Sequence, residues 1–322
     1  MRYFLGFLAF LIIELAAAPA SAQLLYSCDF SISNVDFGNI DPNAGTAVDT
    51  TASLGVTCQG LGLLVATKVR ICPNINAGSG GAISGIRRML NPANQALQFN
   101  LYQDAARSVP WGAAEQPALG TVPPIDLTIP LLGSVSTTRT IYGRVLPNQQ
   151  GAASGVYTSI FSGNEVRITF TDYLLSAPSC NSITANPTST TFTAQANVPS
   201  NCNITARNID FGSHGILNTA VDSAGGLNVT CTQGTSYSIG LNNGLTGTGP
   251  TTRRMTLGDQ AVTYGLYKDA ARSQPWGSSG GDLVQGTGNG ATATLPVYGR
   301  VPTQRTPSPG TYTDTVVVTI TY

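Results

Sequence analysis

Charge, histidine and aromatic residues are scarce in this sequence. Of its 322 residues only 10% are charged and 7% aromatic, and His214 is the single histidine. The 16 basic and 16 acidic residues balance, and without clustered Lys and Arg the chain does not look like a nucleic-acid-binding protein. One histidine excludes a histidine-rich metal site and leaves little room for Ser-His or Cys-His catalysis. We therefore expect no enzyme, no metal and no other cofactor.

Long apolar runs are missing except near the start of the chain. Arg2 precedes a short apolar run over residues 4–13, and Ala20-Ser21-Ala22 has the form of a signal-peptidase site. We expect residues 1–22 to be a secretory signal, so that the mature chain begins at Gln23. The alternative is an N-terminal membrane anchor, for which the run is short.

The six cysteines include no Cys-x-x-Cys pair. An even number of cysteines in an exported chain predicts disulfides rather than a zinc site. The first two and the last two cysteines have nearly equal spacings, which assigns one bridge to each half of the chain. The remaining two are expected to bond to each other or, alternatively, to another chain. The expected bridges are Cys28–Cys58, Cys202–Cys231 and Cys72–Cys180.

An internal repeat divides the chain. The segment LYQDAARSVPWG at 101–112 returns as LYKDAARSQPWG at 266–277, and YGRV at 142–145 returns at 298–301. Repetition of this kind marks duplicated structural units. We expect domain 1 over residues 23–175, a linker over 176–200 and domain 2 over 201–322.

Both halves have the pattern of β proteins. Strand-like runs rich in β-branched residues occupy 166–171 and 316–321, and Gly, Pro, Asn and Ser interrupt the chain at short intervals. No helical period is sustained. Each domain is therefore predicted to be one β-sandwich.

These motifs resemble the spore coat protein U domain family, whose members are largely subunits of archaic chaperone–usher pili. The resemblance rests on VDFG at 35–38 and IDFG at 209–212, the two longer repeated motifs, and a Gly-x-Tyr-Thr sequence near the end of each domain. It implies an all-β fold of two tandem, incomplete immunoglobulin-like sandwiches that donor strands complete. The partners it implies are a periplasmic pilus chaperone, an outer-membrane usher and an adjacent subunit that donates a strand to domain 2.

Residues 188–199 are the candidate donor segment within this chain, because apolar and polar residues alternate there. Its apolar side consists of Phe192, Ala194, Ala196 and Val198. We expect the segment to complete domain 1; the alternatives are a plain linker or the first strand of domain 2. Few mature residues precede Cys28, and Tyr322 directly follows the last predicted strand. The sequence thus predicts a subunit that accepts a strand and donates none, as a pilus tip subunit would.

Domain 1 is longer than domain 2 after Cys58, between Trp111 and Tyr142, and after Tyr157. The added residues are apolar, although loops usually carry polar side chains. We expect three hydrophobic loops at the distal end of domain 1 that bind abiotic or host surfaces. The alternative is that these residues extend strands and are buried, which we expect in part for Leu127, Ile129 and Leu131. The expected surface-binding residues are Leu61, Leu63, Leu64, Val122, Pro123, Pro124, Ile125, Ile160 and Phe161.

One acidic–basic pair recurs in both domains, as Asp104 with Arg107 and as Asp269 with Arg272. A salt bridge that stabilises a turn is the expected role, and a catalytic pair is the alternative.

The predicted function is that of a pilus tip adhesin, secreted through the periplasm to the cell surface, which mediates attachment and biofilm formation. The alternatives are a glycan-binding tip lectin and a structural pilus or coat subunit without a binding role.

Overall fold

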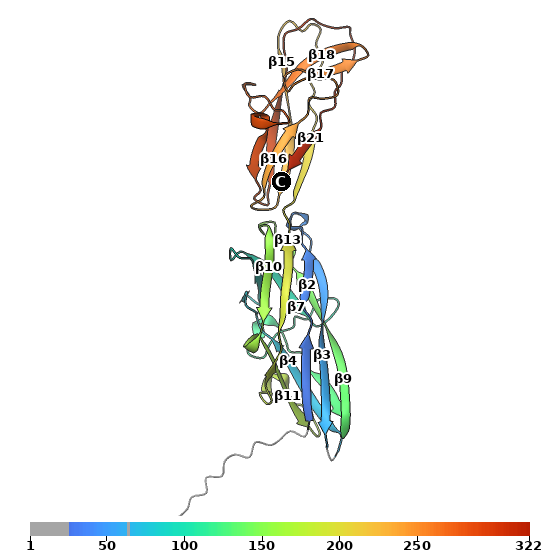
Figure 1. Ribbon diagram of the computed structural model, residues 1–322, viewed down its shortest axis with the longest axis vertical. Helices are drawn as coiled ribbons and strands as arrows, with labels where there is room; N and C mark the ends of the chain where they lie inside the picture. Colours follow the sequence, from blue (N-terminus) through green and yellow to red (C-terminus); the bar gives the residue numbers. More distant parts are fainter. Residues whose placement is uncertain (1–25, 63–64) are drawn as a thin grey trace, which may run out of the picture.

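The computed structural model describes residues 26–62 and 65–322, which form two β-sandwich domains arranged end to end (Figure 1). The predicted signal over residues 1–22 lies outside the described part. The predicted all-β architecture of two sandwiches is confirmed. No helix in the described part is long and apolar enough to cross a membrane.

Domain 1 packs a large, curved sheet against a smaller one. In the large sheet the strands follow the order β1 (Tyr26–Ile32), β3 (Val48–Leu61), β9 (Leu132–Val145), β7 (Ala96–Tyr102), β6 (Ile86–Leu90), β10 (Gly155–Phe161), β13 (Phe192–Val198) and β2 (Val35–Asn39), and β5 (Ala82–Ile83) pairs with β6. The small sheet has the order β12 (Thr188–Ser189), β11 (Val166–Tyr173), β4 (Thr67–Ile75) and β8 (Ile125–Ile129).

Domain 2 has the same plan with fewer strands. Its larger sheet has the order β14 (Cys202–Arg207), β15 (Val221–Cys231), β20 (Thr292–Val301), β18 (Gln260–Tyr267) and β17 (Arg253–Leu257). Its smaller sheet has the order β19 (Val284–Thr287), β16 (Ser236–Leu241) and β21 (Val318–Thr321). Short 3-10 turns occur at Pro42–Ala44, Pro117–Leu119, Gly163–Glu165, Cys180–Ser182 and Gly280–Asp282.

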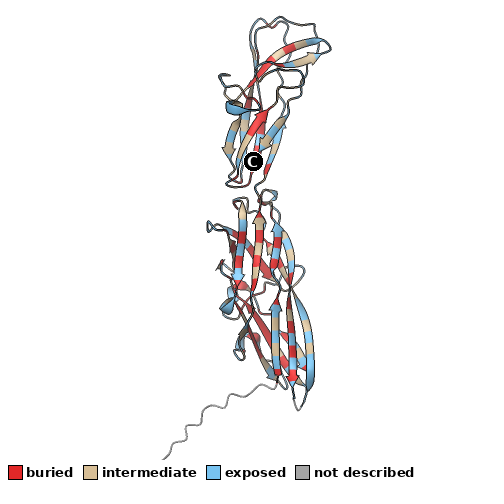
Figure 2. Ribbon diagram, in the orientation of Figure 1, coloured by how far each residue is buried: buried red, intermediate tan, exposed pale blue. Residues whose placement is uncertain are grey.

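Alternation along the strands builds the core of each domain (Figure 2). On β3, for example, Leu54 and Val56 are buried while the residues between and beside them are exposed or half-buried. Trp111 and its repeat Trp276 are fully buried, and their indole N–H groups donate to the carbonyls of Pro73 (2.9 Å) and Ile239 (3.0 Å). Both tryptophans therefore belong to the packing of the sandwich.

A buried arginine also recurs in both domains. The Arg87 guanidinium donates to the carbonyls of Asn76, Ile75 and Trp111 and to the Asn100 side chain at 2.6–2.8 Å. Burial lowers the pKa of Arg87 to about 9, which leaves the group charged at neutral pH. Arg253 occupies the matching place in domain 2 and donates to the Trp276 carbonyl at 2.8 Å. These arginines satisfy carbonyls that the sandwich would otherwise bury unpaired.

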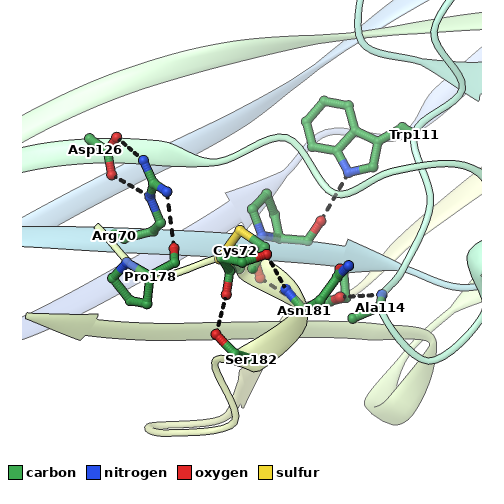
Figure 3. The surroundings of a disulfide bond; sticks show 12 residues. Arg70, Cys72, Trp111, Ala114, Asp126, Pro178, Asn181 and Ser182 are labelled. Carbon is green, nitrogen blue, oxygen red and sulfur yellow. Dashed lines mark hydrogen bonds and ion pairs between the residues drawn. A yellow bond between two sulfur atoms is a disulfide. The ribbon is translucent and has the colours of Figure 1, made fainter. Parts of the chain in front are cut away.

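Residues 176–200 were predicted to be a linker that contains a candidate donor strand, and residues 176–198 of this segment lie within domain 1. After β11 ends at Tyr173, the chain turns back along the small sheet, where β12 pairs with β11, and then enters the large sheet as β13. The Cys72–Cys180 disulfide fastens this returning segment to β4 (Figure 3). Arg70 fastens it too, because its guanidinium donates to the Pro178 carbonyl (3.0 Å) while it pairs with Asp126.

The other two disulfides each join the first strand of a domain to the strand beside it. Cys28–Cys58 links β1 to β3, and Cys202–Cys231 links β14 to β15. The pairing is the one that the spacing predicts, and no cysteine in the described part is free.

Candidate functional site

Strand β13 closes the sandwich of domain 1. It pairs antiparallel with β10 along its whole length, from Phe192 opposite Phe161 to Val198 opposite Gly155. On its other edge it pairs in parallel with β2, with Ala194 beside Val35. The four apolar residues named as the candidate donor face all point into the core and are buried, namely Phe192, Ala194, Ala196 and Val198.

Side chains fix β13 on both of its faces. On the inner face the Phe192 ring stacks on Phe161, with centroids 4.4 Å apart. On the outer face the Gln195 amide donates to Asp36 (2.9 Å), and the Asn197 amide donates to Asn39 (2.8 Å). The strand thus holds its register through both core packing and polar contacts.

Domain 2 contains the two segments that flank this strand position. Residues 310–316 correspond to β10: the Tyr312 hydroxyl donates to the Ser308 carbonyl (2.7 Å), as Tyr157 does to Ala153 (2.9 Å). Residues 209–213 correspond to β2, because the ring centroids of Phe211 and Tyr264 are 5.9 Å apart, as are those of Phe37 and Phe99. The strands of domain 2 also have counterparts in domain 1: β14 corresponds to β1, β15 to β3, β20 to β9, β18 to β7, β17 to β6, β16 to β4, β21 to β11 and β19 to β8.

Between these two segments, domain 2 has no counterpart of β13 among its described residues 201–322. Without that partner, neither 209–213 nor 310–316 forms a strand. The side chains that β13 covers in domain 1 are buried, whereas their counterparts are half-buried; these counterparts are Ile209, Phe211, Tyr312 and Val316. We call residues 209–213 and 310–316 the acceptor site. Backbone edges beside partly exposed core are the features that strand addition requires.

The opposite end of the molecule carries exposed apolar side chains. Leu132 pairs with Leu61 where β9 begins and β3 ends, and the Leu131 carbonyl accepts from the Gly62 N–H at 3.2 Å. Tyr173 pairs with Lys68, and Lys68 with Thr128, so the residues after β11 lie at this same end. Six exposed residues form what we call the distal patch, namely Leu61, Val65, Leu131, Leu132, Leu174 and Leu175.

The distal patch differs from the predicted set of surface-binding residues. Leu61 is exposed as expected, while Leu63 and Leu64 lie outside the described residues. Pro124 and Ile160 are exposed, but Ile160 lies beside Ser79, to whose hydroxyl its N–H is bonded at 2.8 Å, and not at the distal end. The three insertions therefore do not share one end of domain 1.

Four of the predicted surface-binding residues are buried, so the prediction is wrong for these four. Phe161 is 0% exposed because β13 returns beside it and supplies Phe192. Val122 packs with Ile183 over the Cys72–Cys180 disulfide, on the outer face of the small sheet. Pro123, the next residue in the chain, is buried, and Ile125 is buried in the main core.

The three residues expected to be partly buried behave differently from one another. Ile129 is fully buried and Leu127 is half-buried, but Leu131 is exposed. Leu131 follows Pro130 in the turn between β8 and β9, where no strand of the described residues covers it.

The distal patch contains two leucines that are not among the predicted surface-binding residues. Leu174 and Leu175 are 89% and 98% exposed. Two adjacent leucines directly after a strand break the alternation of that strand, so one of them has no inward-facing position to occupy. This break in pattern is the signal that could have identified them.

A small cavity of about 240 Å³ opens between β8 and β9, and it bears on the glycan-binding alternative. Its lining includes Asp126, Thr138 and Arg139 but no aromatic ring. Asp126 already accepts two hydrogen bonds from Arg70, at 2.6 and 2.8 Å. The cavity is therefore poorly equipped for a sugar, which usually stacks on an aromatic face.

The arginine of the recurring Asp–Arg motif pairs with a different carboxylate from the one predicted. Arg107 pairs with Asp49 (3.2 Å), not with Asp104, and Arg144 also binds Asp49 at 2.7 Å. Asp104 instead accepts from the backbone N–H groups of the turn that follows it and from the Ser108 hydroxyl (2.8 Å). Domain 2 repeats both arrangements, so the motif stabilises a loop in each sandwich. Within residues 26–62 and 65–322, no group of three or more metal-binding side chains is found.

Comparisons with known proteins agree with this architecture. The family model of the Spore Coat Protein U domain matches residues 14–163 and 188–319. Protein U of Myxococcus xanthus is 33% identical over 127 residues, which cover 35% of this chain and 71% of Protein U.

Among solved structures, the fold is similar to a chain of the CsuC-CsuE chaperone–tip adhesion subunit pre-assembly complex from the archaic chaperone-usher Csu pili of Acinetobacter baumannii. The TM-score is 0.52 at 16% identity, and the alignment covers 92% of this chain and 100% of the other. At that identity the likeness is one of fold. The family match extends over both repeats, and the chain belongs to the Spore Coat Protein U domain family.

Proposed function

We propose that this protein is a tip adhesin of a chaperone–usher pilus, in which domain 1 binds a surface and domain 2 joins the fibre. The observation that carries the proposal is the contrast between two homologous sandwiches in one chain. Domain 1 is completed by its own β13, whereas in domain 2 no described strand occupies the same position between residues 209–213 and 310–316. The fold likeness to a chaperone–tip adhesion subunit complex supports this assignment.

A strand from the adjacent pilus subunit would satisfy domain 2 in the way that β13 satisfies domain 1. The added strand would pair with residues 310–316 and 209–213 and bury the half-exposed core beneath it. Until then the acceptor site is an aggregation hazard. A periplasmic chaperone that covers it, and an outer-membrane usher that exchanges chaperone for subunit, are the partners this role requires.

The use of β13 within its own chain gives the subunit a direction. That segment is buried in domain 1 and is not available to another subunit. The acceptor site then lies at one end of the molecule and the distal patch at the other (Figure 1). A subunit with this arrangement is suited to the end of a fibre at the cell surface, after secretion through the periplasm.

The distal patch suits attachment to hydrophobic abiotic surfaces. If contact removed about 300 Å² of apolar area from water, the gain would be at most about 7 kcal/mol, and the entropy cost of association would offset much of it. A single tip would therefore bind weakly. Many fibres on one cell would bind well through multivalency, which is what early biofilm formation requires.

Leucine substitutions in the distal patch test the surface-binding role. Cells that display the fibre with Leu132→Asp or Leu175→Asp should lose most of their attachment to polystyrene, while fibre number is unchanged. Ile83→Asp is the matched control, because Ile83 is an exposed apolar residue of domain 1 on β5. Attachment that excess sugars abolish, and that both leucine variants retain, would favour the glycan-binding alternative.

Immunogold labelling tests the position in the fibre. A tip subunit should give at most one label per fibre, at the free end. Labels along the whole length would instead assign the protein to the shaft, as a structural subunit.

A further inference from the structure

One inward-facing residue of the acceptor site differs in kind from its counterpart in domain 1. Ser159 on β10 is buried, faces Ala194 of β13 directly and accepts from the Gly80 N–H at 3.3 Å. Asp314 holds the matching position in domain 2. The two positions match because each side chain lies against a glycine. Ser159 lies against Gly78 in domain 1, and Asp314 lies against Gly244 in domain 2.

The Asp314 carboxylate is fixed by groups of its own domain. Its Oδ2 atom accepts from the Tyr264 hydroxyl (2.7 Å), and its Oδ1 atom accepts from the N–H groups of Leu245 (2.9 Å) and Thr315 (2.8 Å). Burial, together with the Asp314 carboxylate, raises the pKa of Tyr264 well above its usual value, so the tyrosine remains a donor. A carboxylate has about four acceptor positions, and Oδ2 therefore retains one.

The register of β13 defines which residue of an incoming strand meets Asp314. In domain 1, Ala194 lies opposite Ser159, with Phe192 and Ala196 as its inward neighbours on the strand. A strand seated in the same way in domain 2 places one inward side chain opposite Asp314, and directly opposed Cβ atoms are about 4.5–5.5 Å apart. Only a short side chain fits between the two strands at that distance and still bonds to the carboxylate.

The chemistry of that side chain then matters for affinity. A methyl group, as in Ala194, removes water from a charged carboxylate and returns no hydrogen bond, which is unfavourable. A short hydroxyl side chain excludes the same water and donates to the free position on Oδ2. In domain 1 the hydroxyl lies on the accepting strand and the methyl on the inserted one. In domain 2 the Asp314 carboxylate is the hydrogen-bond acceptor and lies on the strand that receives the insertion. The inserted strand therefore has to supply the hydrogen-bond donor.

We infer that Asp314 selects the donor strand of the adjacent subunit: the acceptor site takes a strand with serine at the Ala194 position and discriminates against the β13 sequence of this protein. This inference rests on the proposed strand acceptance by domain 2 and adds the chemistry of the partner. Before β13 is buried in domain 1, the same preference would also disfavour insertion of this segment into domain 2.

Synthetic strands test the inference on the full mature chain. One peptide has the sequence of residues 188–199 and the second differs only by Ala194→Ser. Each peptide is added while the mature chain refolds, and the dissociation constant of the peptide–protein complex is then measured. Protection of residues 310–316 from hydrogen exchange locates the peptide in domain 2 rather than in domain 1. We expect the serine peptide to bind about tenfold more tightly, as for a hydrogen bond to a charged group.

Substitution of the carboxylate provides the second arm. In Asp314→Ser, which copies domain 1, the preference for the serine peptide should disappear. Asp314→Asn keeps the shape of the side chain and removes its charge, and it should weaken the preference for the serine peptide. This variant replaces Asp314→Ser in the experiment if the latter fails to fold.

The outcomes separate the two proposals. Equal binding of both peptides at residues 310–316 would overturn the selection by Asp314 and leave strand acceptance intact. Binding of neither peptide there would overturn strand acceptance, and the inference with it.

Discussion

The aromatic rings of Phe161 and Phe192 stack face to face, with 4.4 Å between their centroids and 5° between their planes. The two residues are opposite each other on β10 and β13. Phe161 lies in an insertion predicted to form a surface loop, and Phe192 begins the candidate donor face. Their contact explains both why that insertion is buried and how the returning segment is held in register.

Phe192→Ala should destabilise domain 1 by about 3–5 kcal/mol, since it removes a buried ring and leaves a cavity beside Phe161. Denaturant unfolding followed by a probe in each domain measures the effect. Thr193→Ala on the outer face of the same strand is the control and should change stability little. Equal effects of the two substitutions would show that β13 does not close the core.

Residues 155–161 and 310–316 should differ in hydrogen exchange, although they correspond in the repeat. The first segment bonds to β13 along its length and the second has no such partner in the described structure. We expect exchange at least about tenfold faster at 310–316 in the isolated protein, measured by mass spectrometry of peptic fragments. Equal protection of both segments would contradict the open acceptor site.

Removing the Cys72–Cys180 bridge with Cys72→Ser and Cys180→Ser should lower the stability of domain 1 by about 2–5 kcal/mol. The bridge closes a loop of 108 residues and fastens the segment that leads into β13. Thermal unfolding should show a lower transition for domain 1 and an unchanged one for domain 2. The matched control, Cys202→Ser with Cys231→Ser, should have the opposite pattern.

Stability should fall in acid partly through Asp49. The hydrogen bond from Arg144 lowers the pKa of this carboxyl, so its contribution is complete above the unfolded value of about 3.9 and is lost as pH falls through the lower, folded value. Asp49 is 37% exposed, and screening limits the contribution to about 1 kcal/mol or less. Asp49→Asn should therefore be less stable than wild type at pH 7, and the difference should shrink below about pH 4.

Asp29→Asn, on the exposed face of β1, is the control for that experiment. Its stability at pH 7 should be close to that of wild type, because Asp29 is exposed. An Asp49→Asn deficit that persists unchanged in acid would show that the side chain acts through shape and not through charge.

Patterns between neighbouring residues allowed much of the fold to be predicted. The repeated motifs located two domains, and the nearly equal cysteine spacings assigned the disulfides that join β1 to β3 and β14 to β15. Alternation over residues 192–198 marked a strand with one buried face. Each of these signals depends on strand periodicity or on duplication, and both are properties of the chain itself.

Exposure at the candidate binding surface depended on the tertiary structure. Phe161 and Val122 are apolar residues in insertions, as Leu61 is, yet β13 covers the first and the Cys72–Cys180 cluster covers the second. Leu132 and Leu175 remain exposed because they lie where strands begin and end and no described segment packs over them. The sequence determines which side chains are apolar and which face of a strand they share. Only the folded chain decides what lies over them, because the covering segment comes from far along the sequence.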